Sequence, residues 1–161
     1  MDLMPNTLNL PPCNLQQRRT PQGRVQLYDI FRQKWVAETP EELVRQHFLQ
    51  YLVGFLGYSP YRLAVERGLM LNGTQRRFDA LIYDVYGRPL VVVEFKAPQI
   101  AVTQRTFDQI VRYNMILKAP YIMVSNGLRH YCAHVDTAGG DCRFLSEIPP
   151  YDSIKDVQKD F

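Results

Sequence analysis

Residues 90–96 (LVVVEFK) constrain the fold of this chain more than any other segment, because they combine the apolar run of a buried β-strand with two charges. Side chains alternate between the two faces of a strand, so Glu94 and Lys96 point to the same face. An unpaired buried charge costs free energy, and a carboxylate and an ammonium group on one face usually pair, bind a metal ion, or do both. We therefore predict a core strand whose end carries a charged site.

A second strand-like run, residues 76–83 (RRFDALIY), comes before the first and is separated from it by the turn residues 86–89 (YGRP). The two runs predict an antiparallel hairpin in which Asp79 lies beside Glu94 near one end of the sheet. Two adjacent carboxylates favour a bound divalent cation over mutual repulsion. The hairpin thus predicts a metal site at this end of the sheet.

An aspartate followed by Glu-x-Lys resembles the motif of the PD-(D/E)xK nuclease superfamily, with Asp79, Glu94 and Lys96 at the matching positions. The order of further motifs narrows the resemblance to the N-terminal nuclease domain of type I restriction enzyme R subunits. These motifs are residues 39–46 (TPEELVRQ), the strand ending at Glu66, the Asp79 strand, residues 93–98 (VEFKAP), Gln109-x-x-x-Tyr113 and residues 125–127 (SNG). The chain resembles a free-standing form of that domain.

The resemblance implies an α/β fold with a restriction-endonuclease-like core, in which a central mixed β-sheet is flanked by helices. The order of predicted helices and strands along the chain agrees with such a sheet. It also implies a DNA endonuclease that depends on Mg²⁺, with Mn²⁺ as an alternative ion. The implied catalytic residues are Asp79, Glu94, Lys96, Gln109 and Tyr113, the implied metal ligands are Asp79, Glu94, the Phe95 carbonyl and Glu41, and the implied DNA contacts are Arg76 and Arg77.

The first helix is predicted at residues 39–57, where Thr39 can act as N-cap and Glu42 completes a Thr-x-x-Glu capping box. On a helical wheel Glu41 falls near the apolar face, whereas Glu42 falls far from it. We therefore expect Glu42 to act mainly as a cap. Glu41 could either reach the metal site or remain in a plain surface position near the helix N-terminus.

The second helix is predicted at residues 103–117, and Gln109 and Tyr113 share one of its faces because they are four residues apart. In the family that the chain resembles, this pair lies beside the active centre. There an amide can hold a water or a phosphate oxygen, and a phenol can add a hydrogen bond. An exposed polar pair without a function is the alternative interpretation.

Two further patterns have competing interpretations. His130, Cys132 and His134 alternate along a predicted strand and share a face, which could indicate zinc, although their spacing matches no finger pattern and such residues usually pack in a core. Arg76 and Arg77 directly precede Asp79 and could contact phosphates, although arginines are often part of a solvated surface.

Charge and composition limit the cellular setting without identifying a ligand. A formal net charge of +3 and a pI near 8.8 permit DNA binding but do not require it. Three widely spaced cysteines fit a reducing compartment, and the sequence shows neither a secretory signal nor an apolar run of the roughly 20 residues that span a bilayer. We expect a cytoplasmic protein that does not enter membranes.

The length of 161 residues and the hydrophobic content of 46% predict one compact core. We expect a flexible N-terminal arm over residues 1–23, a nuclease domain over residues 24–149 and a C-terminal tail over residues 150–161. The sequence lacks a Gly-x-x-x-x-Gly-Lys-Ser/Thr loop, so we expect no ATP site in this chain.

DNA is the expected partner, and other subunits of a restriction system or a second copy of the chain are further candidates. Two alternatives to a restriction nuclease remain open at this stage. The chain could be a non-catalytic DNA-binding or assembly module with a nuclease fold, or a repair or structure-selective nuclease, because one fold serves all of these functions.

Overall fold

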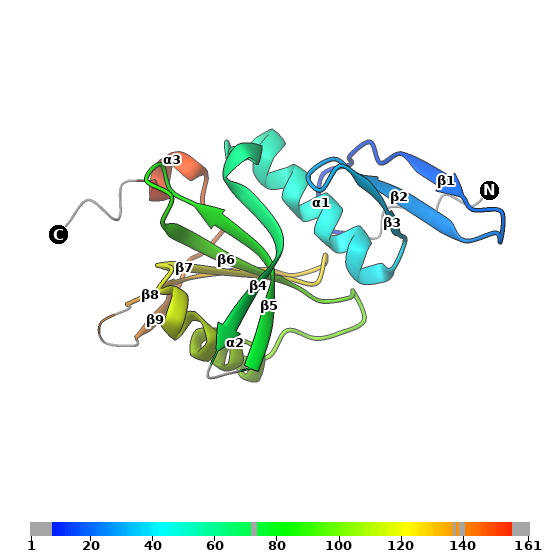
Figure 1. Ribbon diagram of the computed structural model, residues 1–161. Coiled ribbons are helices and arrows are strands. Elements are labelled where there is room, and N and C mark those ends of the chain that lie inside the picture. The colour runs from blue at the N-terminus through cyan, green and yellow to red at the C-terminus, as the bar shows by residue number, and fades with distance from the viewer. Residues whose placement is uncertain (1–7, 72–73, 137, 139–140, 156–161) are drawn as a thin grey trace.

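The structure is a computed structural model that describes residues 8–71, 74–136, 138 and 141–155, without the side chains of residues 67–76. Two β-sheets and two long helices make up most of it (Figure 1). In chain order the elements are β1 (Gln17–Arg19), β2 (Val25–Asp29), β3 (Lys34–Ala37), α1 (Pro40–Phe55), the 3-10 helix η1 (Pro60–Arg62), β4 (Leu63–Leu71), β5 (Thr74–Tyr83), β6 (Pro89–Phe95), α2 (Gln104–Leu117), β7 (Tyr121–Ser125), β8 (His130–Val135), β9 (Cys142–Phe144) and α3 (Tyr151–Ile154).

The main sheet has six strands in the order β4-β5-β6-β7-β8-β9. β6 and β7 run parallel, whereas the other neighbouring strands run antiparallel. A parallel pair needs a crossover connection, and α2 supplies it between β6 and β7. This mixed sheet with flanking helices confirms the predicted fold class.

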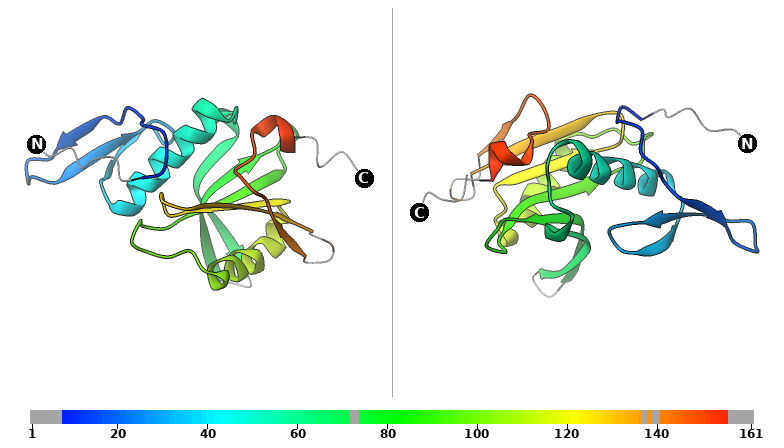
Figure 2. Two further views of the ribbon diagram at one scale, coloured as in Figure 1. Left: turned by 180° about the vertical axis from the view of Figure 1, so that it is seen from behind. Right: turned by 90° about the horizontal axis from the view of Figure 1, so that it is seen from above.

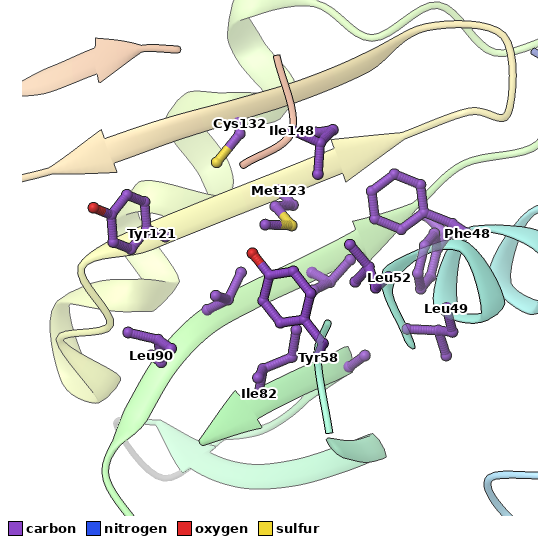
Figure 3. Close-up of a cluster of buried hydrophobic side chains, with 14 of the residues drawn as sticks. Phe48, Leu49, Leu52, Tyr58, Ile82, Leu90, Tyr121, Met123, Cys132 and Ile148 are labelled. Carbon is purple, nitrogen blue, oxygen red and sulfur yellow. The ribbon is translucent and has the colours of Figure 1, made fainter. Parts of the chain in front are cut away.

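The two helices lie on opposite sides of the main sheet (Figures 1 and 2). Side chains from α1, including Phe48 and Leu52, pack in one buried cluster with Val91 and Val93 of β6 (Figure 3). A second cluster joins side chains of α2 to Val92. Because successive side chains of β6 enter different clusters, this strand is covered on both faces, as a run of valines predicts.

The hairpin formed by β4 and β5 is longer than the sequence predicted. The sequence predicts a turn-rich connection over residues 68–75 after a strand over residues 61–67, but backbone pairing continues to Leu71↔Thr74. The predicted connection is therefore wrong at this place. Glycine and polar residues suggested a turn, but the pairing with the neighbouring strand outweighs such local preferences.

A small antiparallel sheet, β1-β2-β3, lies beside α1 and away from the main sheet (Figures 1 and 2). β1 falls within the segment that we expected to be a flexible arm. Its three side chains are exposed, so no alternation of apolar and polar residues indicates this strand. Ahead of it Leu10 is buried in the main core. At the other end α3 forms a short helix at the start of residues 150–161, which we expected to be a tail. The division into arm, domain and tail stays a prediction.

Candidate active site

Asp79 and Glu94 meet across the β5–β6 pair. The register Ala80↔Val93 places the two carboxylates opposite each other, and their side chains share a hydrogen bond. The backbone N–H of Phe95 donates to Asp79 Oδ2 over 2.8 Å. Burial, followed by the nearby Asp79 carboxylate, raises the pKa of Glu94 to about 9. The predicted pair of carboxylates is therefore in direct contact at the end of the core strand.

Lys96 follows β6 directly and shares a pocket of about 270 Å³ with Glu94. The backbone N–H of Lys96 donates to the Ser125 carbonyl over 2.9 Å, which extends the β6–β7 pairing by one residue and fixes the start of the next loop. The residues that line the pocket are Arg77, Phe78, Glu94, Lys96, Thr106, Gln109, Ile110 and Tyr113. Strand and helix residues thus converge on one hollow.

The polar pair of α2 lines the same pocket. Gln109 Nε2 donates a hydrogen bond of 3.0 Å to the Tyr113 hydroxyl, as one helical turn between them permits. The helix is capped at its start by Thr103, whose side chain accepts from the backbone N–H of Thr106. Phe107 and Ile110 pack in the second cluster, and this packing fixes the rotation of α2. The structure therefore brings Gln109 and Tyr113 to Glu94 and Lys96.

Of the two arginines that precede Asp79, the structure describes the side chain of Arg77. Arg77 is exposed and lines the pocket beside Lys96, where its guanidinium can meet an anionic ligand. The side chain of Arg76 lies outside the described residues.

Of the two glutamates of α1, Glu42 lies in a different environment from the one that the sequence predicted. Glu42 is only 7% exposed and pairs with Arg32 and Arg45, so the prediction that it lies far from the buried face is wrong. The helical wheel missed this burial because Arg32 comes from outside the helix, next to β2. Thr39 caps the helix as predicted, since its hydroxyl accepts from the backbone N–H of Glu42 over 3.0 Å.

Glu41 is half-exposed and belongs electrostatically to the Asp79 site. Burial, followed by repulsion from Asp79, raises the pKa of the Glu41 carboxyl, while Arg45 and Lys96 act in the opposite direction. Glu41 Oε1 and Asp79 Oδ1 lie 3.9 Å and 3.5 Å from the same nitrogen, Arg45 Nη2, so Glu41 lies near Asp79 although it comes from a different element.

Arg45 is a site residue that the sequence analysis missed. Its side chain is 6% exposed and lies among four carboxylates. Nη1 pairs with Glu42 and lies 3.8 Å from Glu66, whereas Nη2 lies 3.5 Å from Asp79 and 3.9 Å from Glu41. Arg45 follows Glu42 by three residues and Glu41 by four, and this helical spacing could have predicted its ion pairs with them.

The zinc interpretation finds no support in the geometry. His130 Nδ1 lies 2.7 Å from Ser125 Oγ, and its Nε2 lies 2.7 Å from the Asn9 carbonyl oxygen. Cys132 is buried in the core, and the ring of His134 packs against Tyr121. The three side chains have separate partners, so ordinary packing accounts for them.

Within the described part of the chain, no three His, Cys, Asp or Glu side chains are grouped as a ready metal site. A magnesium ion does not require such a group, because proteins usually bind it through one or two carboxylates while it keeps several waters. Asp79 and Glu94 supply two carboxylates in contact, and the Phe95 carbonyl belongs to the same strand end. The donor set therefore consists of the oxygen ligands that this ion prefers.

The chain matches the family described as type I restriction enzyme R protein N terminus (HSDR_N) over residues 40–149. It belongs to this family. The matched residues of this HSDR_N chain include the β5–β6 site and both long helices, whereas β1, β2 and β3 precede them. No curated protein matches the chain.

A solved structure has the same fold as this HSDR_N chain. It is a fragment described as an HsdR subunit of a type I restriction enzyme from Vibrio vulnificus YJ016, with a TM-score of 0.51 and 23% sequence identity. The likeness covers 73% of this chain but 24% of that one, so this chain spans about a quarter of its length. The comparison confirms the restriction-endonuclease-like core that we predicted.

Among the described helices, none combines the length and the apolar character required to cross a bilayer.

Proposed function

We propose that this HSDR_N chain is a DNA endonuclease that hydrolyses phosphodiester bonds with Mg²⁺, for which Mn²⁺ can substitute. The observation that carries the proposal is the contact between Asp79 and Glu94 at the strand end. Lys96 lies on the same face of the strand as Glu94 and lines the same pocket. A structural role alone gives no reason to place these groups together, because buried charges cost free energy.

In this proposal Asp79, Glu94 and the Phe95 carbonyl hold the cation, and Glu41 adds negative charge from α1. The Phe95 N–H fixes Asp79 by its hydrogen bond to Oδ2, so the carboxylate is oriented before any ligand binds. When bound, the ion lowers the pKa of a coordinated water and neutralises charge on the scissile phosphate.

The remaining pocket residues act on the substrate. Lys96 orients the attacking water and stabilises the negative charge that develops on the phosphate. Gln109 and Tyr113, joined by their hydrogen bond, hold a water or a phosphate oxygen at the other side of the pocket. Arg77, preceded by Arg76, attracts the DNA backbone, to which arginines bind without reading its sequence.

Family membership supports a role in restriction and favours it over DNA repair. The partners that we propose are DNA and either other subunits of a restriction system or a second copy of this chain. One active centre per chain cuts one strand at a time, so cleavage of a duplex is simplest for two chains acting together. The location that we propose is the cytoplasm, as membership of this family suggests.

Substitution of Lys96 by alanine tests the proposal. We expect the Lys96→Ala variant to lose about 10²- to 10³-fold in cleavage rate or more, because one electrostatic contributor to the transition state is removed. The measurement is cleavage of supercoiled plasmid and of single-stranded DNA with Mg²⁺ or Mn²⁺, with EDTA as the metal-free control.

Lys155→Ala is the matched control, since Lys155 pairs with Asp152 on α3 and does not line the pocket. This control should cleave like the unmodified chain. Normal cleavage by Lys96→Ala would show that the assignment is wrong. Absence of cleavage and of cation binding in the unmodified chain would favour the alternative, a non-catalytic DNA-binding or assembly module.

A further inference from the structure

One nitrogen of Arg45 lies between two of the candidate metal ligands. Nη2 is 3.5 Å from Asp79 Oδ1 and 3.9 Å from Glu41 Oε1. Glu41 is therefore linked to the Asp79 site through a fixed positive charge. The other candidate ligand, Glu94, meets Asp79 from β6 and has a different neighbour, Lys96.

Arg45 is held firmly in this position. Its other terminal nitrogen, Nη1, pairs with Glu42, which in turn pairs with Arg32. Arg32 also pairs with Asp29 and lies 3.1 Å from Glu66, so the network ties β2, α1 and β4 together. If the Arg45 guanidinium left this network, buried carboxylates would lose their ion-pair partner, which is strongly destabilising. Arg45 is thus a permanent part of the site.

A second cation bound by Glu41 and Asp79 would need the space and the charge that Arg45 already supplies. In nucleases with two metal ions, the ions are about 3.5–4 Å apart, and each takes carboxylate oxygens. A magnesium ion lies about 2.0–2.1 Å from its oxygen ligands. An ion bridging these two carboxylates would therefore come close to Nη2, where two positive charges in a partly buried site repel strongly.

We propose that this chain binds a single catalytic cation, at Asp79 and Glu94, and that the Arg45 guanidinium occupies the place of a second one. The inference rests on the proposed function and makes it more specific. Glu41 is then a positioning residue that acts through Arg45 rather than by binding the ion. The guanidinium supplies a positive charge that does not depend on the concentration of free cations.

Counting bound Mn²⁺ tests this inference without reference to cleavage. Electron paramagnetic resonance and titration calorimetry should give one Mn²⁺ per chain for the unmodified protein. In the Arg45→Gln variant the count should rise to two, because an amide leaves the oxygens of Asp79 and Glu41 available and carries no charge.

Arg32→Gln is the matched control. It removes one positive charge from the same network, but Arg32 pairs with Asp29, Glu42 and Glu66 and not with Asp79. The count should stay at one in this variant. A count of two would show that general loss of positive charge, and not the place of Arg45, admits the second ion, and would overturn the inference.

Glu41→Gln tests the same point without disturbing a buried arginine. Circular dichroism establishes that each variant folds, and if Arg45→Gln does not, Glu41→Gln decides. We expect it to keep one Mn²⁺ with a Kd within about threefold of the unmodified protein, whereas loss of the ion would make Glu41 a ligand and overturn the inference.

The unmodified protein separates the inference from the proposed function. Two Mn²⁺ ions per chain would overturn the single-cation inference and leave the nuclease proposal standing. No bound Mn²⁺ would overturn both.

Discussion

At the scale of single residues, the Asp79 carboxylate is held in place by a partner on each of its oxygens. Its Oδ2 accepts the Phe95 N–H, and its Oδ1 faces Arg45. With one donor on each oxygen, the carboxylate cannot rotate freely, which keeps it in place when Glu94 changes charge. At Glu94, burial and Asp79 both disfavour the charged form, and the opposing effect of Lys96 is smaller. The two carboxylates therefore differ in their response to pH.

Glu94 makes the stability of the metal-free protein depend on pH. Its pKa is raised from 4.5 to about 9 on folding, so the folded state holds this proton more tightly than the unfolded state. This contribution to stability is complete below about pH 4.5 and is lost as pH rises towards about 9. We therefore expect the free energy of unfolding of the unmodified protein to fall, relative to that of Glu94→Gln, as the pH rises from about 5 to about 8.

Urea unfolding in EDTA measures this difference at each pH. Added Mg²⁺ should reduce it, because a bound cation favours the ionised carboxylate. A constant difference between the two proteins across this range would contradict the prediction.

At the scale of elements, the turn between β7 and β8 connects the site to the N-terminal segment. The Ser125 carbonyl accepts the backbone N–H of Lys96, and the Asn126 side chain donates to the Ile100 carbonyl over 2.8 Å. On its other side the Gly127 carbonyl accepts the backbone N–H of Asn9 over 2.7 Å. The turn therefore holds both the residue that follows β6 and the strap of residues 8–10.

Gly127→Ala should destabilise the protein by about 1–3 kcal/mol. Gly127 has a φ of +85°, and an added Cβ would lie 2.6 Å from Leu8 Cδ2 and 3.0 Å from Val44 Cγ2. Backbone strain and this clash act in the same direction. The free energy of unfolding in urea measures the effect.

Gly54→Ala is the matched control. Gly54 lies in α1, and nothing lies within 4 Å of its added Cβ, so alanine should stabilise the helix by about 0.5–1 kcal/mol. Equal effects at the two glycines would mean that the close approach of Leu8 does not matter.

At the scale of the whole molecule, segments near both ends of the described chain complete one core. Leu10 from the N-terminal segment and Ile148 and Ile154 from the C-terminal segment belong to the cluster that α1 forms with the main sheet. The Tyr58 hydroxyl donates to the Pro149 carbonyl over 2.7 Å, which ties the C-terminal segment to the region after α1. This packing makes the ends part of the domain's stability.

Ile154→Ala should cost about 2–5 kcal/mol, because Ile154 is only 2% exposed and its removal leaves a cavity. Thermal and urea unfolding measure the loss. Asp152→Ala, in the same short helix, should change stability by less than about 1 kcal/mol, since its ion pair with Lys155 is exposed. An effect of Ile154→Ala as small as that of Asp152→Ala would show that α3 does not contribute to the core.

The sequence by itself determined the parts of the site whose partners are close in the chain or share one hairpin. A short turn joins two strand patterns, so the pairing of Asp79 with Glu94 follows from local order. The spacing of Gln109 and Tyr113 likewise places them on one helix face. The alternation of residues 90–96 indicated the face that Glu94 shares with Lys96.

Only the tertiary structure decided the places of Glu41, Glu42 and the arginines. The helical wheel describes α1 alone, whereas Arg32 approaches this helix from the turn after β2 and pairs with Glu42, which is buried. The contacts of Arg45 reach from α1 to Asp79 in β5, a separation that no local period encodes. Long-range packing thus sets the charge balance around the candidate metal ligands, because the fold as a whole determines which charged groups meet in a buried site.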